Sequence, residues 1–239
     1  MDVRTSALDG ARWAPGAFGE ALRQAAPIVL GYLPVGFAYG VLALKTGLSP
    51  LNAVLMSALV FAGSAQLIAV GLLAAGASPL SVAATTFVVN LRHLLMAASL
   101  APHLRGWPAS RLAWFGFQLT DETFALHSLR FMQGPPRVAQ TLWINAVAHG
   151  AWVAGSALGV AASAAVADVR PLGLDYALPA MFIALVVGQV RGAVHVLVGL
   201  AAAGLALGLH AAGAGPWSVI LATLGAAALG TGVSAWTRR

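Results

Sequence analysis

Residues Thr46 to Leu91 read TGLSPLNAVLMSALVFAGSAQLIAVGLLAAGASPLSVAATTFVVNL and contain no charged side chain. As one helix rising about 1.5 Å per residue, this stretch would be about 69 Å long, more than twice the roughly 30 Å hydrocarbon core of a bilayer. The chain must therefore reverse within it, and the residues from Gly76 to Pro79 are those that end helices. A second charge-free run, residues 192–237, is interrupted in the same way between Ala212 and Pro216.

The composition of the full sequence places the chain in the membrane class. Hydrophobic residues make up 59% of the sequence and charged residues 8%, whereas soluble domains carry roughly 25% charged residues. The patterning predicts an all-α, polytopic transmembrane helix bundle of about eight spans, some of them discontinuous or re-entrant. The approximate spans are 25–44, 51–75, 79–100, 110–132, 138–166, 174–190, 192–211 and 216–236. Seven spans is the alternative, because 174–190 is short and could be re-entrant.

The distribution of basic residues predicts how the bundle is oriented. Residues 1–24 form a cytoplasmic or interfacial segment, and residues 25–239 form a single transmembrane transporter domain. With the N-terminus cytoplasmic, eight basic residues fall inside: Arg4, Arg12, Arg23, Arg130, Arg137, Arg191, Arg238 and Arg239. Four fall outside: Lys45, Arg105, Arg111 and Arg170. Loops rich in Lys and Arg stay in the cytoplasm, which favours this orientation.

Several classes of function are disfavoured by what the sequence lacks. The net charge of +6 comes from single basic residues scattered between apolar runs, so no nucleic-acid partner is expected. The chain has no cysteine, which excludes disulfides and thiolate metal ligands. We expect no cofactor and no enzymatic activity. An intramembrane metal-dependent enzyme built on Asp121, Glu122, His127 and His93 is the rival hypothesis, but no HExxH motif is present.

A few ionisable residues lie at membrane depth, where charge is costly and usually marks a pathway or an ion pair. Asn90, Arg92 and His93 fall in the third expected span, and Asp121 and Glu122 fall in the fourth. Arg92 is expected to pair with one of the two carboxylates at similar depth, leaving the other free. Such a group can bind or release a proton and couple transport to it; the alternative is a static ion pair that fixes helix packing.

Two further segments are candidates for breaks within a span. Small residues and an amide, Gly63, Ser64 and Gln66, lie in the middle of the second span. A helix broken there would expose backbone N–H groups suited to a carboxylate, whereas the alternative is close helix packing through Gly63 and Ser64. In the fourth span, Gln118, Asp121 and Glu122 share one side of a helical wheel, and further polar residues share the other. Such a helix is central, locally unwound around a cavity, or covered by another subunit.

Three motifs in order resemble the hallmark segments of the AzlC family: Phe61–Gln66 (FAGSAQ), Val89–Met96 (VNLRHLLM) and Asp121–Ala125 (DETFA). The resemblance extends to Gly31–Gly40 and to Asp175–Leu185, and so covers nearly all of the chain from Pro27 onward. It implies the large subunit of a two-component exporter of branched-chain amino acids in a bacterial cytoplasmic membrane, with a small AzlD-like membrane subunit as partner.

The residues themselves are compatible with an amino-acid exporter, because a zwitterion needs a carboxylate site, an ammonium site and an apolar slot. We assign the substrate carboxylate to Arg92 and the Gly63/Ser64 backbone, and the ammonium to Asp121 or Glu122. Arg92 cannot bind a carboxylate side chain fully and hold the substrate at the same time, which suggests that it alternates between these two partners. The remaining alternative is a scaffold subunit whose partner carries the transport path.

Overall fold

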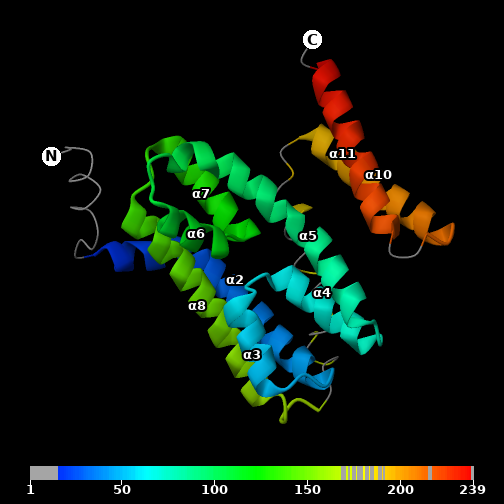
Figure 1. The fold of residues 1–239 in the computed structure, drawn as a ribbon, viewed down its shortest axis with the longest axis horizontal. Helices are drawn as coiled ribbons and strands as arrows, with labels where there is room; N and C mark the ends of the chain where they lie inside the picture. The colour runs from blue at the N-terminus through cyan, green and yellow to red at the C-terminus, as the bar shows by residue number, and fades with distance from the viewer. Residues whose placement is uncertain are drawn as a thin grey trace. The chain divides into compact units, whose positions relative to one another are not determined.

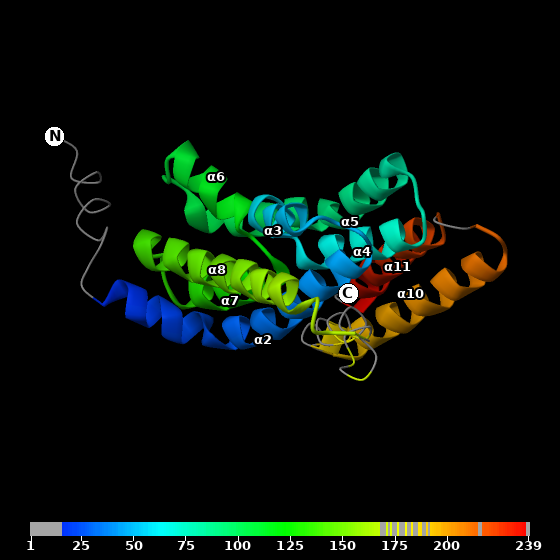
Figure 2. The same cartoon turned by 90° about the horizontal axis from the view of Figure 1, so that it is seen from below.

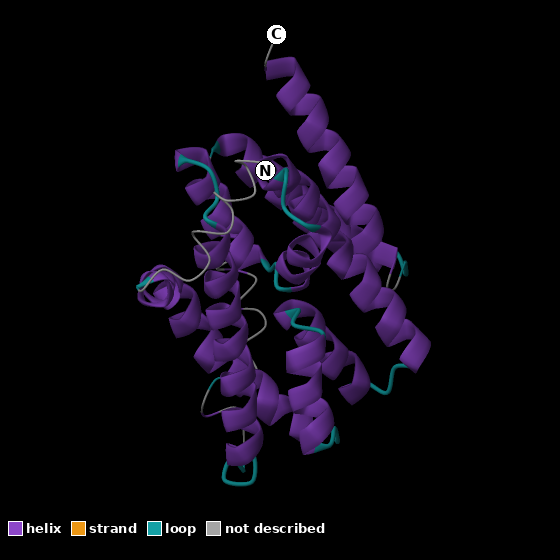
Figure 3. Cartoon of the chain, turned by 60° about the vertical axis from the view of Figure 1, so that its left-hand side comes forward, coloured by secondary structure: helices purple, strands orange, loops and turns teal. Residues whose placement is uncertain are grey.

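The computed structural model describes residues 16–167, 192–214 and 217–237, with isolated residues between 171 and 190. Every regular element in these ranges is a helix (Figure 3). Four of the described helices are long and apolar enough to cross a membrane: Ala17–Lys45, Pro79–Leu104, Val138–Ala162 and Ala193–Ala211. The prediction of an all-α membrane bundle is confirmed. Most of the expected span 174–190 and of the segment 1–24 lies outside the described residues, and the first of the described helices already begins at Ala17.

The chain divides into two compact units, residues 1–178 and 179–239. In the second unit, α10 (Ala193–Ala211) and α11 (Trp217–Thr237) pack antiparallel, since a Cβ on Gly225 would lie 3.2 Å from Leu205 and one on Gly230 would lie 3.0 Å from Val198. The predicted site residues all lie in the first unit.

Two long helices, α2 (Ala17–Lys45) and α8 (Val138–Ala162), run parallel and side by side in the first unit (Figure 2). Glycines spaced four residues apart line their contact: Gly36, Gly40, Gly155 and Gly159. A Cβ on Gly36 would lie 2.9 Å from the carbonyl oxygen of Trp152, and one on Gly155 would lie 2.6 Å from that of Leu33. Only small residues allow backbones to approach this closely, as in other membrane helix pairs.

The second expected span is a re-entrant hairpin rather than a crossing. It consists of α3 (Pro50–Leu59) and α4 (Gly63–Ala74), and Phe61 in the break has a left-handed φ of 45°. Four residues separate the end of α2 from the start of the hairpin, and four separate its end from the start of α5 (Pro79–Leu100). Figure 1 shows the end of α2 and the start of α5 at the same end of the unit, with the break pointing to its middle.

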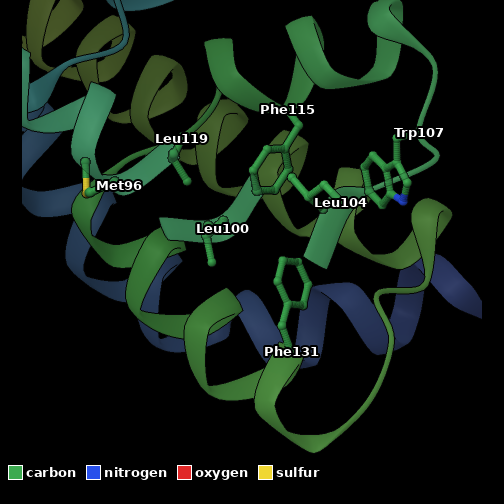
Figure 4. Close-up of a cluster of buried hydrophobic side chains, with 7 residues drawn as sticks. All are labelled: Met96, Leu100, Leu104, Trp107, Phe115, Leu119 and Phe131. Carbon is green, nitrogen blue, oxygen red and sulfur yellow. The ribbon is translucent and has the colours of Figure 1, made fainter. Parts of the chain in front are cut away.

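The fourth expected span also folds back on itself, as α6 (Ala109–Phe117) and α7 (Asp121–Gln133). The rings of Phe115 and His127 lie 5.4 Å apart, although a continuous helix would separate these residues by about 18 Å. Figure 4 shows Phe115 and Phe131 in one cluster that also holds Leu104, from the short 3₁₀ helix η1 (Ala101–Leu104). The prediction that some segments are discontinuous or re-entrant is thus confirmed, and the assignment of 51–75 and 110–132 as crossings is corrected.

The two hairpins enter the first unit from opposite ends, because α5 crosses it between them. Its 22 residues span about 33 Å. One end, which we call the Arg-rich end, carries the start of α2 and five arginines: Arg23, Arg105, Arg111, Arg130 and Arg137. The other, the Lys45 end, carries the end of α2. The expectation that Arg105 and Arg111 lie opposite Arg137 is wrong, because Arg111 lines the same surface hollow as Val138.

Candidate functional site

Each hairpin has a tip where its two helices meet: residues 60–62 between α3 and α4, and residues 118–120 between α6 and α7. Arg92, in the middle of α5, contacts both hairpins next to these tips. Its Nη1 lies 2.9 Å from Oδ2 of Asp121, the first residue of α7, and its Nη2 donates a hydrogen bond to Oγ of Ser64, in the first turn of α4. The side chains of Arg92 and Asp121 are 28% and 17% exposed, so both ions are largely withdrawn from solvent. The predicted ion pair exists, and its acidic member is Asp121.

Helix geometry explains why these groups meet at the two breaks. The first turn of a helix presents unpaired N–H groups and the positive end of the helix dipole, which favours an acidic side chain such as Asp121 there. Thr120 caps α7 through a capping box with Thr123, whereas Ala62 offers α4 no side-chain cap. The start of α4 therefore keeps N–H donors that no capping side chain occupies, beside the guanidinium of Arg92.

Glu122 is held by a residue that sequence reasoning missed. The hydroxyl of Tyr32, on α2, donates to Oε2 of Glu122 at 2.6 Å and accepts from the hydroxyl of Thr120 at 2.7 Å. The expectation that the second carboxylate is free is therefore wrong. The only sequence signal for Tyr32 is a hydroxyl within an apolar, glycine-rich and proline-rich span, and its partners lie about ninety residues away.

A pocket of about 230 Å³ lies between the two tips and α5. Its lining is Val60, Phe61, Ala62, Asn90, His93, Gly116, Phe117 and Leu119. Around it, three buried polar atoms have no hydrogen-bond partner among the described residues: Oδ1 of Asn90, Nε of Arg92 and Oε1 of Gln118. Unsatisfied buried groups are costly and rare in native proteins, so they indicate a place where a polar solute can bind. Of these three residues only Asn90 lines the pocket itself, whereas Arg92 and Gln118 lie next to lining residues in the chain.

Gly63 and Gln66 face α8 instead of this pocket. A Cβ on Gly63 would lie 2.8 Å from the ring of Trp152, and Trp152 Nε1 donates to Oε1 of Gln66 at 3.0 Å. The Gln66 amide donates in turn to Ser57 at 3.1 Å, so both ends of this fully buried side chain are occupied. Both interpretations of the segment therefore apply, since α4 begins at a break and its first turn also packs closely. A direct role for Gly63 and Gln66 in binding stays a prediction.

Buried polar side chains also connect α7 and α8. His127 Nε2 lies 2.7 Å from Oδ1 of Asn145, and Arg130 Nη2 donates to Oε1 of Gln140 at 2.6 Å. These contacts satisfy the polar stripe of α7 that faces away from Asp121. Among the described residues, no group of three or more His, Asp or Glu side chains is arranged to hold a metal ion.

Comparison with known proteins places the chain in a family. The family model described as AzlC protein matches residues 27–166. The inner membrane protein YgaZ of Escherichia coli is 33% identical over 71% of this chain and 72% of its own length. The branched-chain amino acid transport protein AzlC of Bacillus subtilis is 31% identical over 74% of this chain and 68% of its own length.

An uncharacterized membrane protein of Archaeoglobus fulgidus is 32% identical over 81% of this chain and 84% of its own length. No solved structure matches the chain significantly. The family match includes both hairpins, the central arginine and α8. The chain belongs to the AzlC family.

Proposed function

We propose that this protein is the large subunit of an exporter of branched-chain amino acids, and that solute binds between the two hairpin tips. Membership of the AzlC family carries a role in membrane transport, and one relative is named for branched-chain amino acid transport. The observation that carries the proposal is Arg92, which bridges Ser64 and Asp121 beside a small pocket with unsatisfied polar atoms.

Each part of an aliphatic amino acid has a chemically matched partner at this site. The carboxylate binds the guanidinium of Arg92 and the uncapped N–H groups of Gly63 and Ser64, because half-helix N-termini in transporters favour anions. The ammonium is held by the Oδ1 atoms of Asn90 and Asp121. The aliphatic side chain packs against the apolar pocket wall: Val60, Phe61, Phe117 and Leu119.

Solute binding competes with the ion pair. A substrate carboxylate that engages Arg92 weakens its bonds to Asp121 and Ser64, so the α6–α7 tip separates from the α4 tip. Glu122 or Asp121 then provides a group for ion or proton coupling. Transport measured across pH in Asp121→Asn and Glu122→Gln tests this role, which unchanged pH dependence in both variants would exclude.

The basic residues support an N-terminus in the cytoplasm of a bacterium, with the protein in its inner membrane. Five arginines lie at the Arg-rich end, and among the described residues only Lys45 is a basic residue of the opposite end. Basic residues accumulate on the cytoplasmic side, so the Arg-rich end is cytoplasmic. Residues 25–239 are proposed to act as a single transporter domain. Its proposed partner is a small AzlD-like membrane subunit, and its proposed function has no catalytic step.

Efflux of labelled leucine, valine and isoleucine tests the proposal directly. Proteoliposomes should hold the chain alone, the small partner alone, or both, with lysine as a control solute. We expect branched-chain efflux from the complex, and its loss in a folded Arg92→Ala variant. Efflux through the partner alone would instead make this chain a scaffold.

A further inference from the structure

The two hairpin tips share a second bridge besides Arg92, and it comes from α8. Nε2 of His149 lies 3.3 Å from the carbonyl oxygen of Ser57 in α3, and its Nδ1 lies 3.2 Å from Nε2 of Gln118, at the end of α6. The imidazole stacks on Phe61, with ring centroids 4.1 Å apart and planes 25° apart. Phe117 meets the same ring edge-on at 5.7 Å. One side chain thus touches both breaks.

The hydrogen bonds fix the state of this histidine. Ser57 lies in the last turn of α3, where carbonyl groups have no partner within the helix, and a carbonyl oxygen can only accept. Nε2 of His149 must therefore carry the proton and donate it. Nδ1 is then the acceptor, and the Gln118 amide donates to it. A neutral imidazole with one defined tautomer satisfies a group at each break.

This bridge differs from the Arg92 bridge in what can disrupt it. A charged solute competes for Arg92, because the guanidinium binds any carboxylate. The bonds of His149 are between neutral groups, so the charged groups of a zwitterion are attracted less strongly to them than to the guanidinium of Arg92. The stack also depends on Phe61, whose left-handed backbone places its ring at the break. We therefore expect the His149 bridge to persist when solute loosens the Arg92 bridge.

We propose that His149 is a positioning residue that holds the two hairpin tips in register, so that opening of the pocket toward one end is coupled to closure toward the other. This inference rests on the proposed function only in treating the tips as the walls of a solute passage. Loss of either hydrogen bond uncouples the tips and leaves the pocket open for a larger fraction of the time.

The absence of native cysteine allows a clean test by thiol labelling. Single cysteines at Ala62 and Gly116 place a thiol in each wall of the pocket, and a Cβ on Gly116 meets nothing within 4 Å. Gly71→Cys, on the exposed side of α4, is the control site. His149→Gln carries its amide near the Nε2 position and keeps the Ser57 bond. His149→Asn carries it near Nδ1 and keeps the Gln118 bond.

We expect labelling of both pocket cysteines by a membrane-impermeant maleimide to rise about three- to tenfold in each His149 variant, the change brought by one lost neutral hydrogen bond. Labelling at Gly71→Cys should not change, nor should His210→Asn have an effect, because His210 is an exposed residue of α10.

Unchanged pocket labelling in whichever His149 variant folds would overturn the proposal, whether or not the melting temperature falls. A fall in melting temperature alone would show a packing role. The assay contains no amino acid, so its result does not depend on which solute is exported.

Discussion

At the residue scale, the site is a set of competing bonds around one guanidinium. Arg92 reaches Asp121 and Ser64 through its two terminal nitrogens, while its buried Nε has no partner among the described residues. A lysine ammonium in its place is a point charge that cannot present this planar fork. The charge of Arg92 and the planar shape of its guanidinium therefore contribute separately to binding at this site.

Arg92→Lys should fold but lower leucine efflux about ten- to hundredfold, because a hydrogen bond to a charged group contributes about 1.5–3 kcal/mol. Arg105→Lys, at an exposed arginine outside the site, is the matched control. Labelled leucine efflux from proteoliposomes measures both. Normal efflux in Arg92→Lys would remove the guanidinium from the mechanism.

Tyr32→Phe should lower the free energy of unfolding by about 1–3 kcal/mol, since it leaves Glu122 and Thr120 without their shared hydroxyl. Tyr39→Phe is matched for stability, because its hydroxyl also donates one bond, to the carbonyl of Ala53 at 3.0 Å. The melting temperature should fall in both variants, but leucine efflux should fall only in Tyr32→Phe. Equal efflux in the two would make Tyr32 a purely structural residue.

Sequence reasoning identified much of this site but not all of its bonds. Arg92 was expected to pair with one of two carboxylates, Asp121 or Glu122, because charge at membrane depth requires a partner. Tyr32 was missed because hydropathy says nothing of which span lies beside which. His149 makes an interhelical hydrogen bond with Gln118. Its contact with both breaks depends on the hairpin fold.

At the element scale, the breaks matter more than the helices. A hairpin of α3 and α4 contains as many apolar residues as a full crossing, so hydropathy cannot separate the two. The small residues after Phe61 and the polar residues Gln118, Asp121 and Glu122 indicated breaks, but not that the chain turns back. That outcome depends on α5 crossing between the hairpins and on the ring contact of Phe115, in α6, with His127, in α7.

Gly159→Ala should destabilise the pairing of α2 with α8, because its methyl group would overlap the backbone at Phe37. Overpacking of this kind costs typically 1–3 kcal/mol. Gly71→Ala, with nothing within 4 Å of its added methyl, should be neutral or slightly stabilising. The melting temperatures of the Gly159→Ala and Gly71→Ala variants are compared by size-exclusion chromatography in detergent after heating. An equal melting temperature for both variants would contradict the close packing.

At the scale of the whole molecule, hairpins that enter from opposite ends place their tips face to face at Arg92. The same pattern, a long helix followed by a helical hairpin, occurs twice in the first unit: α2 with α3–α4, and α5 with α6–α7. The two copies run in opposite directions. Inverted repeats of this kind occur in transporters whose solute site lies at mid-membrane. The arrangement also gathers five arginines at one end.

Sidedness of single cysteines checks this topology. Cysteines at Arg105 and Arg137 should react with an impermeant maleimide from the same side of the membrane, and a cysteine at Lys45 from the opposite side. Oriented vesicles of both polarities provide the measurement. Had α6 and α7 formed one crossing, position 105 would label together with position 45, and that result would rule out the α6–α7 hairpin.

The most direct test of the central claim, that solute binds between the hairpin tips at Arg92, is protection of Gly116→Cys by leucine. At ten times its Kd, leucine should slow maleimide labelling at this position about tenfold. Protection should be absent at Gly71→Cys and lost when Arg92→Ala is added. Labelling that leucine leaves unchanged, in a Gly116→Cys complex that still exports leucine, would contradict the account.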